Sequence, residues 1–111
     1  MDSNLSQEKC IPCSVGTPAL EGEELNELMK EIENDWDLIK DKKIVRKFNF
    51  DNFAKALEFV NKVSSIAEEK GHHPDIEFGW GRAEISFMTH KIDGLSRNDF
   101  IMASLVDELQ T

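Results

Sequence analysis

Cysteines, histidines and basic residues are few in this chain of 111 residues. Its two cysteines, Cys10 and Cys13, cannot build a disulfide scaffold, so the fold must rest on a hydrophobic core. Only 13 Lys and Arg stand against 22 Asp and Glu, which gives a formal net charge of -9. Such an acidic surface repels phosphate backbones, and no local cluster of Lys and Arg offsets it. We therefore expect no nucleic-acid partner.

Long apolar runs are also missing. None approaches the roughly 20 residues that span a bilayer, and the polar stretch 1–9 lacks the apolar segment of a secretory signal. We therefore expect no membrane association and a cytoplasmic location. A hydrophobic content of 40% and a charged content of 32% are typical of one globular domain of this length.

The sequence divides into an N-terminal arm and one folded domain. Residues 1–19 show no hydrophobic periodicity and contain two of the three prolines, Pro12 and Pro18. We expect this arm to be loosely held unless it packs on a partner. Hydrophobic periodicity then runs through residues 20–111, which we assign to a single domain.

Helical and strand-like patterns alternate within that domain. Apolar residues at helical spacing and alternating hairpin patterns follow one another over 21–34 (helix), 36–50 (hairpin), 53–70 (helix), 76–90 (hairpin) and 97 onward (helix). The order αββαββα predicts an α+β fold in which a four-stranded antiparallel sheet carries three helices on one face. The other face then needs cover, which self-association would supply.

The ends of two helices carry specific signals. We expect Asp51 to be the N-cap of the second helix. Gly71 fits the left-handed position that ends the same helix. Ser96 and Asp99 have the spacing of a capping box at the start of the third helix.

The three histidines are placed so that they converge. His72 and His73 lie in a loop, where Gly71 frees the backbone and Pro74 biases His73 toward extended geometry. We expect His90 to end the strand that pairs with the strand leaving this loop, so all three meet at one edge. Because free imidazole has a pKa of about 6.5, such a site can donate and accept protons near neutral pH.

Other interpretations of these residues stay open at this point. His72, taken alone, fits a surface residue that compensates the dipole of the preceding helix. Three histidines with Cys10 or Cys13 also suggest zinc, but adjacent histidines are a poor ligand spacing and a single Cys-x-x-Cys is a weak signal. The cysteine pair also lacks the strand and helix context of a redox motif. We therefore expect no metal site and no cofactor.

A longer motif surrounds the histidines. It reads, in order, Glu68, three residues, His72-His73-Pro74, five residues, Trp80, nine residues, His90, eight residues and Asp99. Further similarity includes the run Phe48-x-Phe50-x-x-Phe53 and extends from about residue 20 to the C-terminus. On these residues the sequence resembles the pterin-4a-carbinolamine dehydratase family.

The resemblance implies an enzyme, a carbon–oxygen hydro-lyase. Its substrate would be 4a-hydroxytetrahydropterin, which an aromatic amino acid hydroxylase leaves behind, and its pathway tetrahydrobiopterin recycling. It also implies a homodimer or homotetramer without a metal. The resemblance places catalysis on His72, His73 and His90, pterin binding on these histidines with Gly71, Met88, Thr89 and Lys91, and supporting roles on Glu68, Pro74, Trp80, Asp99 and Trp36.

Roles for the individual residues follow from their chemistry. We expect His72 and His90 to transfer protons and His73 to orient the departing hydroxyl. Glu68 and Asp99 are each placed to orient an imidazole, although the helix cap explains Asp99 equally well. Trp36 lines the pocket in one interpretation and is a core aromatic in the other.

Two alternative functions remain. The first is a dimerisation or assembly cofactor of a partner protein. Some relatives of this fold bind the helical dimerisation segment of a transcription factor, and others act in protein assembly and have lost the histidines. The second is a role in another pterin pathway, such as molybdenum cofactor metabolism, with the same site. Retention of all three histidines favours catalysis.

Overall fold

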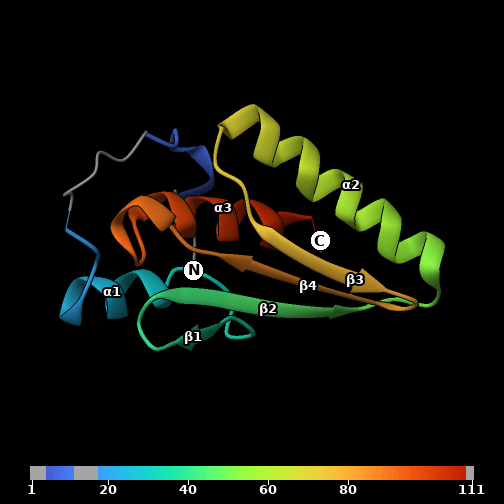
Figure 1. Ribbon diagram of the computed structural model, residues 1–111, viewed down its shortest axis with the longest axis horizontal. Coiled ribbons are helices and arrows are strands. Elements are labelled where there is room, and N and C mark those ends of the chain that lie inside the picture. Colours follow the sequence, from blue (N-terminus) through green and yellow to red (C-terminus); the bar gives the residue numbers. More distant parts are fainter. Residues whose placement is uncertain (1–4, 12–17, 110–111) are drawn as a thin grey trace.

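The computed structural model describes residues 5–11 and 18–109 (Figure 1). Its elements are, in chain order, η1 (Leu5–Gln7), α1 (Gly22–Met29), β1 (Asp37–Ile39), β2 (Lys43–Asn49), α2 (Phe53–Lys70), β3 (Asp75–Gly79), β4 (Arg82–Phe87), η2 (His90–Ile92) and α3 (Arg97–Glu108). The predicted α+β fold is confirmed, with three α-helices, a four-stranded antiparallel sheet and the order αββαββα. Within the described ranges, no helix has the length and apolar character needed to cross a membrane.

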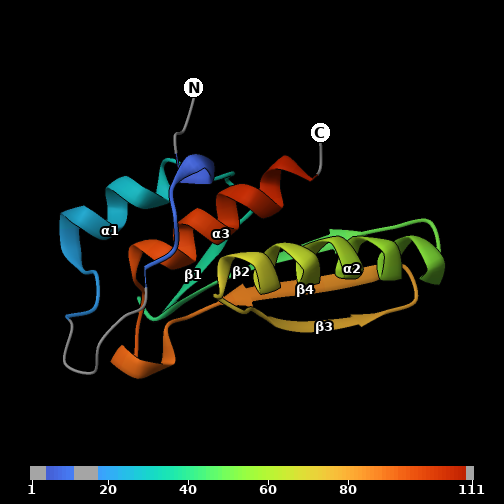
Figure 2. The ribbon, with the colours of Figure 1, turned by 90° about the horizontal axis from the view of Figure 1, so that it is seen from above.

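The sheet has the strand order β1-β2-β4-β3, and every neighbouring pair is antiparallel. Its register places Ile44 opposite Phe87 and Ile76 opposite Ile85. These apolar side chains belong to the hydrophobic core or pack against it. The view from above shows the helices gathered on one face of the sheet (Figure 2). The hydrophobic core therefore lies between this face of the sheet and the helices.

The opposite face of the sheet is polar, so it does not need the cover by self-association that we expected. Lys47 lies opposite Glu84, Glu84 lies opposite Glu77, and Asp75 lies opposite Ser86. Lys47 and Glu84 also form a solvent-exposed ion pair at 3.9 Å. An antiparallel sheet can keep such a face in water, so hydrophobic burial does not require a second copy there. Self-association stays a prediction.

Helix α2 has nearly the ends that the sequence predicts. The N-cap is Asn52 rather than Asp51, because the Asn52 Oδ1 accepts a hydrogen bond from the Lys55 backbone N–H at 2.8 Å. Gly71 ends the helix as predicted, with a φ of 71° that a side chain would make costly. Helix α1, in contrast, is shorter than the predicted range 21–34.

Strand β4 is also shorter than predicted, and this moves His90. The strand ends at Phe87, after which Thr89 forms an isolated bridge with Gly94. The Thr89 Oγ1 donates a hydrogen bond to the buried Asp99 at 2.8 Å, which draws the chain toward α3. His90 therefore begins η2, within this turn, and does not end a strand.

Residues 5–11, here termed the N-terminal strap, pack on α3. The Leu5 side chain is 1% exposed and belongs to the hydrophobic core. The Glu8 carboxylate accepts hydrogen bonds from both Nε and Nη2 of Arg97, each at 2.7 Å. The expectation of a loosely held arm is therefore wrong for the strap. Residues 12–17, with Pro12 and Cys13, lie outside the described residues, and the domain boundary after residue 19 stays a prediction.

The variant Arg97→Gln is expected to be less stable than the unmodified chain at neutral pH but not in acid. Hydrogen bonds from Arg97, followed by its charge, lower the pKa of Glu8. Because the folded-state pKa lies below the unfolded-state value, the stabilisation is complete above the unfolded pKa and is lost as the pH falls through the folded pKa. Urea midpoints of the two proteins should differ at neutral pH and converge as the pH falls through the lowered pKa of Glu8. A difference that persists in acid would contradict this assignment.

Candidate active site

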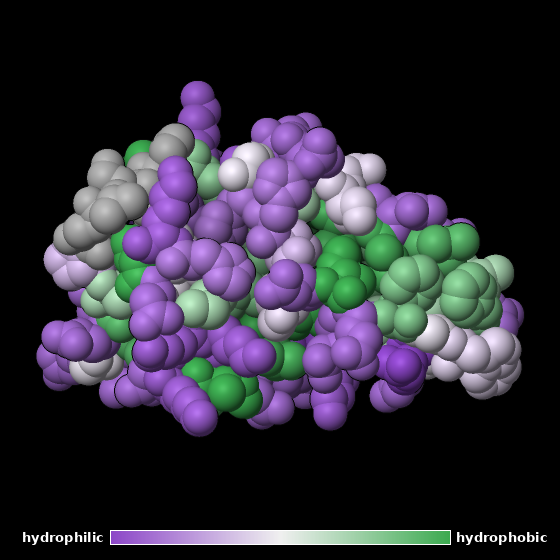
Figure 3. Space-filling model, in the orientation of Figure 1, coloured by the Kyte–Doolittle hydropathy of each residue, from purple (hydrophilic) through white to green (hydrophobic). Residues whose placement is uncertain are grey.

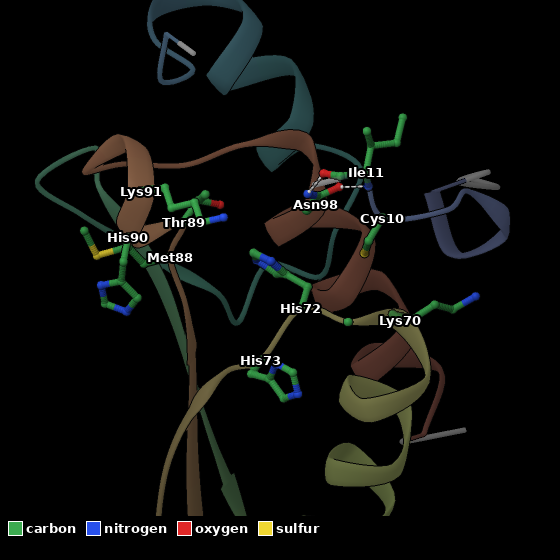
Figure 4. Close-up of a pocket in the computed structure, with 11 residues that line it drawn as sticks. Cys10, Ile11, Lys70, His72, His73, Met88, Thr89, His90, Lys91 and Asn98 are labelled. Atoms are coloured by element: carbon green, nitrogen blue, oxygen red, sulfur yellow. Dashed lines mark hydrogen bonds between the residues drawn. The ribbon is translucent and has the colours of Figure 1, made fainter. Parts of the chain in front are cut away.

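A cavity of about 360 Å³ opens where α2 ends and β3 begins (Figure 4). Its wall comes from the loop after α2, the chain from β4 into η2, the first turn of α3 and the N-terminal strap. The lining residues are Cys10, Ile11, Lys70, Gly71, His72, His73, Met88, Thr89, His90, Lys91 and Asn98. All the residues that we expected to bind substrate are therefore brought around one cavity, and their role in binding stays a prediction.

His72 is held by a buried carboxylate. Its Nε2 lies 2.6 Å from Oδ1 of Asp99, whose side chain is 0% exposed. The imidazole also stacks on Phe87, with ring centroids 6.3 Å apart and planes 13° apart. These contacts fix the plane of the ring and occupy Nε2, which leaves Nδ1 as the nitrogen available to a ligand.

Asp99 is itself held by a second set of hydrogen bonds. Its Oδ2 accepts from the Thr89 hydroxyl at 2.8 Å and from the Ser96 backbone N–H at 2.9 Å. The Ser96 hydroxyl lies 2.8 Å from the Thr89 Oγ1 and can donate to it. The predicted capping box is confirmed. Asp99 therefore both caps α3 and holds His72, so the two interpretations of this residue are compatible.

His73 is held by the other predicted carboxylate, but at the surface. Its Nε2 lies 2.5 Å from Oε2 of Glu68, which stands in the last turns of α2. Both side chains are mostly exposed to solvent. Glu68 thus orients His73, while Asp99 orients His72, so the two adjacent imidazoles have separate partners.

His90 reaches the cavity from a different element. It begins η2, and its side chain is 72% exposed. The Oδ2 of Asp75 lies 3.9 Å from the His90 Nε2. Figure 4 shows His90 and His72 on different sides of the cavity, with His73 below them. Groups bound between them can therefore meet imidazoles from two directions.

Two residues of the motif lie outside the cavity lining. Trp80 stands in the turn between β3 and β4, at the opposite end of β3 from the histidines, and is 72% exposed. Within one chain, the spacing that made Trp80 a site candidate does not bring it to the site. Pro74 is half-buried and leads from His73 into β3 without lining the cavity.

Trp36 is a core aromatic residue and does not line the pocket. It is buried, and its ring centroid is 6.0 Å from that of Phe87. Its indole N–H donates a hydrogen bond to Oδ1 of Asp107 at 2.8 Å. Trp36 therefore supports the ring that stacks on His72 but does not line the cavity.

The cysteines and histidines do not form a metal-binding group in the described part of the chain. Over residues 5–11 and 18–109, no three His, Cys, Asp or Glu side chains are placed to hold a metal ion. Cys10 contributes to the cavity wall, and Cys13 lies outside the described residues. Three imidazoles, which can each donate or accept a proton, line the cavity.

Four lining residues were missed by the sequence analysis. Lys70 and Asn98 are direct neighbours in sequence of the predicted Gly71 and Asp99, and this proximity could have identified them. Cys10 was weighed only as a zinc ligand or a redox group, and Ile11 was not singled out, because the place of this segment depends on contacts with α3.

Comparisons with known protein sequences agree with the motif. The family model described as pterin 4 alpha carbinolamine dehydratase matches residues 18–109. A Rubrobacter xylanophilus protein named "Putative pterin-4-alpha-carbinolamine dehydratase" is 50% identical over 107 residues, which is 96% of this chain and 99% of the relative. A protein of the same name from Alkaliphilus metalliredigens is 44% identical, with 98% of each chain covered.

Solved structures share the fold. A crystal structure titled as a transcriptional coactivator/pterin dehydratase from Brucella melitensis superposes with a TM-score of 0.77 at 26% identity. The alignment covers 84% of this chain and 99% of that one. A pterin dehydratase-like protein described as a RuBisCO assembly factor in the alpha-carboxysome has a TM-score of 0.58 at 24% identity, covers 69% of this chain and 90% of its own, and supports the fold alone.

Proposed function

The chain belongs to the pterin 4 alpha carbinolamine dehydratase family, and on this premise we propose that it removes water from a 4a-hydroxytetrahydropterin. The substrate is the form that an aromatic amino acid hydroxylase leaves after it has used tetrahydropterin, and the product of the dehydration is the quinonoid dihydropterin. The observation that carries this proposal is the convergence of three imidazoles on one cavity, two of them hydrogen-bonded to carboxylates.

The reaction needs an acid and a base on one ring. The bond between C4a and the hydroxyl oxygen breaks, and a proton delivered to that oxygen lets it leave as water. The N5–H proton is removed, and the electron pair of that bond forms the C4a=N5 double bond. Positioned imidazoles can perform both transfers, and each such transfer typically contributes about 10²–10⁴-fold to the rate.

The geometry supports His72 and His90 as the proton-transfer pair. His72 offers Nδ1, because its Nε2 is occupied by Asp99, and this ring is held rigidly. His90 comes from η2 and is largely exposed, so it can approach a bound ring from another side. His73, oriented by Glu68, is left to bind and orient the departing hydroxyl.

An absorbance assay tests the proposal directly. Purified protein should accelerate the loss of 4a-hydroxytetrahydropterin, followed in the ultraviolet, above the uncatalysed rate. Substrates with different substituents at C6 would identify the preferred pterin and separate tetrahydrobiopterin recycling from another pterin pathway. A rate equal to background with every pterin would overturn the dehydratase assignment.

The variant Asp99→Asn is expected to lower kcat by about 10–100-fold, because a neutral amide no longer holds His72 as the carboxylate does. The pH profile of kcat is a second readout, because the substitution changes a group in direct contact with the imidazole, 2.6 Å from its Nε2. Ser96→Ala is the matched control, because it weakens the same helix cap while leaving the contact between His72 and Asp99 in place. Equal activity losses in the two variants, with unchanged pH profiles, would reduce Asp99 to a structural role.

A binding function is the second candidate, favoured by an exposed apolar patch. Phe53, Leu57 and Trp80 are large apolar side chains that lie partly or mostly in solvent, at the end of the sheet away from the cavity. A green area of apolar residues is visible at this end of the molecule (Figure 3). We propose that this patch supports a homodimer or homotetramer, which analytical ultracentrifugation would detect. A stoichiometric complex with a different protein, together with no dehydratase activity, would favour an assembly or coactivator role.

A further inference from the structure

Thr89 links the two imidazoles that are proposed to transfer protons. It directly precedes His90 in the chain, and its hydroxyl donates a hydrogen bond to Asp99, the residue that holds His72. The family resemblance placed Thr89 among the residues that bind pterin. Its contacts indicate a different role for the side chain.

The Thr89 hydroxyl is buried and already paired within the protein. The residue is 6% exposed, and its Oγ1 lies 2.8 Å from Oδ2 of Asp99 and 2.8 Å from the Ser96 hydroxyl. A threonine hydroxyl has one proton to donate, and an ionised carboxylate can only accept. The Thr89 proton therefore goes to Asp99, the Ser96 hydroxyl donates to the Thr89 oxygen in return, and no proton of this group is left for a ligand.

The hydrogen bond from Thr89 helps to fix which oxygen of Asp99 faces His72. Oδ2 of the carboxylate accepts from the Thr89 hydroxyl and from the Ser96 backbone N–H at 2.9 Å, which leaves Oδ1 for the His72 Nε2 at 2.6 Å. Rotation of the carboxylate would break both bonds to Oδ2 at a buried position, where lost hydrogen bonds are costly. Without the Thr89 hydroxyl one of these two donors is gone, and the His72 ring is held less precisely.

The same residue anchors the turn that carries His90. The Thr89 N–H donates to the Gly94 carbonyl at 2.8 Å, and the Thr89 carbonyl accepts from the N–H groups of Ile92 at 3.2 Å and Gly94 at 3.4 Å, so the turn closes on Thr89. The His90 side chain is 72% exposed, and its distance of 3.9 Å to Asp75 is too long for a hydrogen bond. The backbone of this turn therefore sets the place of His90, and the Thr89 hydroxyl ties that backbone to α3.

We propose that Thr89 is a positioning residue, and that its hydroxyl sets the His72 and His90 imidazoles relative to each other. This inference rests on the proposed dehydratase function, because both imidazoles act there on one ring. Figure 4 shows the two imidazoles on different sides of the cavity, with Thr89 close to His90. A misplacement of about 1 Å can cost about 10²-fold in rate, whereas pterin binding does not use this hydroxyl. Thr89 therefore contributes to kcat and not to affinity.

The full-length variant Thr89→Val tests this role, because it removes the hydroxyl and keeps nearly the same shape. The value of kcat for 4a-hydroxytetrahydropterin should fall by about tenfold. KM, and the dissociation constant of 7,8-dihydrobiopterin measured by equilibrium dialysis, should change by less than about twofold. Thr89→Ser keeps the hydroxyl and should retain kcat within about threefold of the original value.

Ser96→Ala is the matched control for the loss of a buried hydroxyl. It removes the neighbouring hydroxyl of the same network and leaves the bond from Thr89 to Asp99 in place. Its kcat should stay within about threefold of the original value, although it also weakens the cap of α3. Circular dichroism would show that each variant is folded, and Thr89→Ala replaces Thr89→Val, with the same expected loss, should the valine variant not fold.

A cycle of double variants tests whether Thr89 acts through Asp99. In the Asp99→Asn background, Thr89→Val should cost clearly less than tenfold, because the partner of the hydroxyl is already altered. In the His73→Ala background it should cost the full factor, since Glu68 holds that imidazole separately. A full tenfold loss in both backgrounds would contradict an action through Asp99.

Other outcomes separate the positioning role from the proposed function. A higher dissociation constant for Thr89→Val with unchanged kcat would make the hydroxyl a pterin ligand. Unchanged kcat in this variant, or a Thr89→Ser variant as slow as Thr89→Val, would also overturn the positioning role while the unmodified chain still turns over substrate. If the unmodified chain turns over no pterin, the proposed function falls, and this inference with it.

Discussion

Replacing both His72 and His90 with alanine is expected to reduce dehydration to the uncatalysed rate. One positioned proton-transfer group typically contributes about 10²–10⁴-fold, and the two imidazoles supply the acid and the base on the same ring. The loss should appear in kcat, since both transfers occur in the transition state and not on binding. The absorbance assay on 4a-hydroxytetrahydropterin measures this directly, and activity retained by the double variant would contradict the assignment.

His73→Ala is the informative comparison for the double variant. His73 lines the same cavity, but its partner Glu68 is at the surface, and its expected role is to orient the hydroxyl. We therefore expect a smaller loss, with His73→Ala retaining more activity than either His72→Ala or His90→Ala. Circular dichroism spectra that match the unmodified chain would show that none of these losses reflects unfolding. A larger loss for His73 than for His72 would exchange their roles.

Asp107→Ala is expected to cause the largest loss of stability, about 3 kcal/mol. The Asp107 carboxylate accepts hydrogen bonds from the Trp36 indole at 2.8 Å, the Arg46 Nη1 at 2.6 Å and the Glu33 backbone N–H at 3.0 Å. Burial raises the pKa of Asp107, because the charged carboxylate is costly to hold away from water. Removal of the carboxylate leaves a mostly buried guanidinium and an indole N–H without this partner. Urea unfolding at neutral pH measures the change.

Asp35→Ala is the matched control for this network. Asp35 contacts the same guanidinium, through Nη2 of Arg46 at 3.1 Å, but its side chain is largely exposed. An exposed ion pair contributes at most about 1 kcal/mol, so this variant should lose much less stability. Equal losses in the two variants would mean that burial of Asp107 does not determine the strength of the network.

The local features of the fold were predictable because short-range physics determines them. Gly71 ends α2 in the left-handed conformation, and Ser96 with Asp99 caps α3, as spacing and residue type indicated. The end of β4 was not predictable in this way. The predicted strand runs on to His90, although the alternation of apolar residues stops at Phe87. The Thr89 hydroxyl donates to Asp99 and draws the chain out of the sheet. A contact between distant segments therefore fixes the path of the chain after Phe87.

The membership of the candidate site was largely predictable, but its pairings were not. The loop around Pro74 and the approach of the β4 end brought the three histidines to one cavity as expected. Whether Glu68 or Asp99 would face His72 could not be read from spacing, since both choices fit the motif. Trp80 was predicted to belong to the site from its place in the motif, and this prediction was wrong within one chain. Strand β3 starts beside the histidines, so Trp80, which follows the last residue of β3, lies at the other end of the sheet.

By itself, the sequence determined the αββαββα order, the end of α2 at Gly71, the capping box of α3 and seven of the eleven residues around the cavity, because periodicity, backbone preference and short spacing act between near neighbours. Only the tertiary structure decided that Asp99 holds His72, that Glu68 holds His73 and that the N-terminal strap forms a wall of the cavity. The strap illustrates the physical reason. Ile11 and Asn98 are 87 positions apart in the chain, and their hydrogen bonds exist only once packing has brought both segments together.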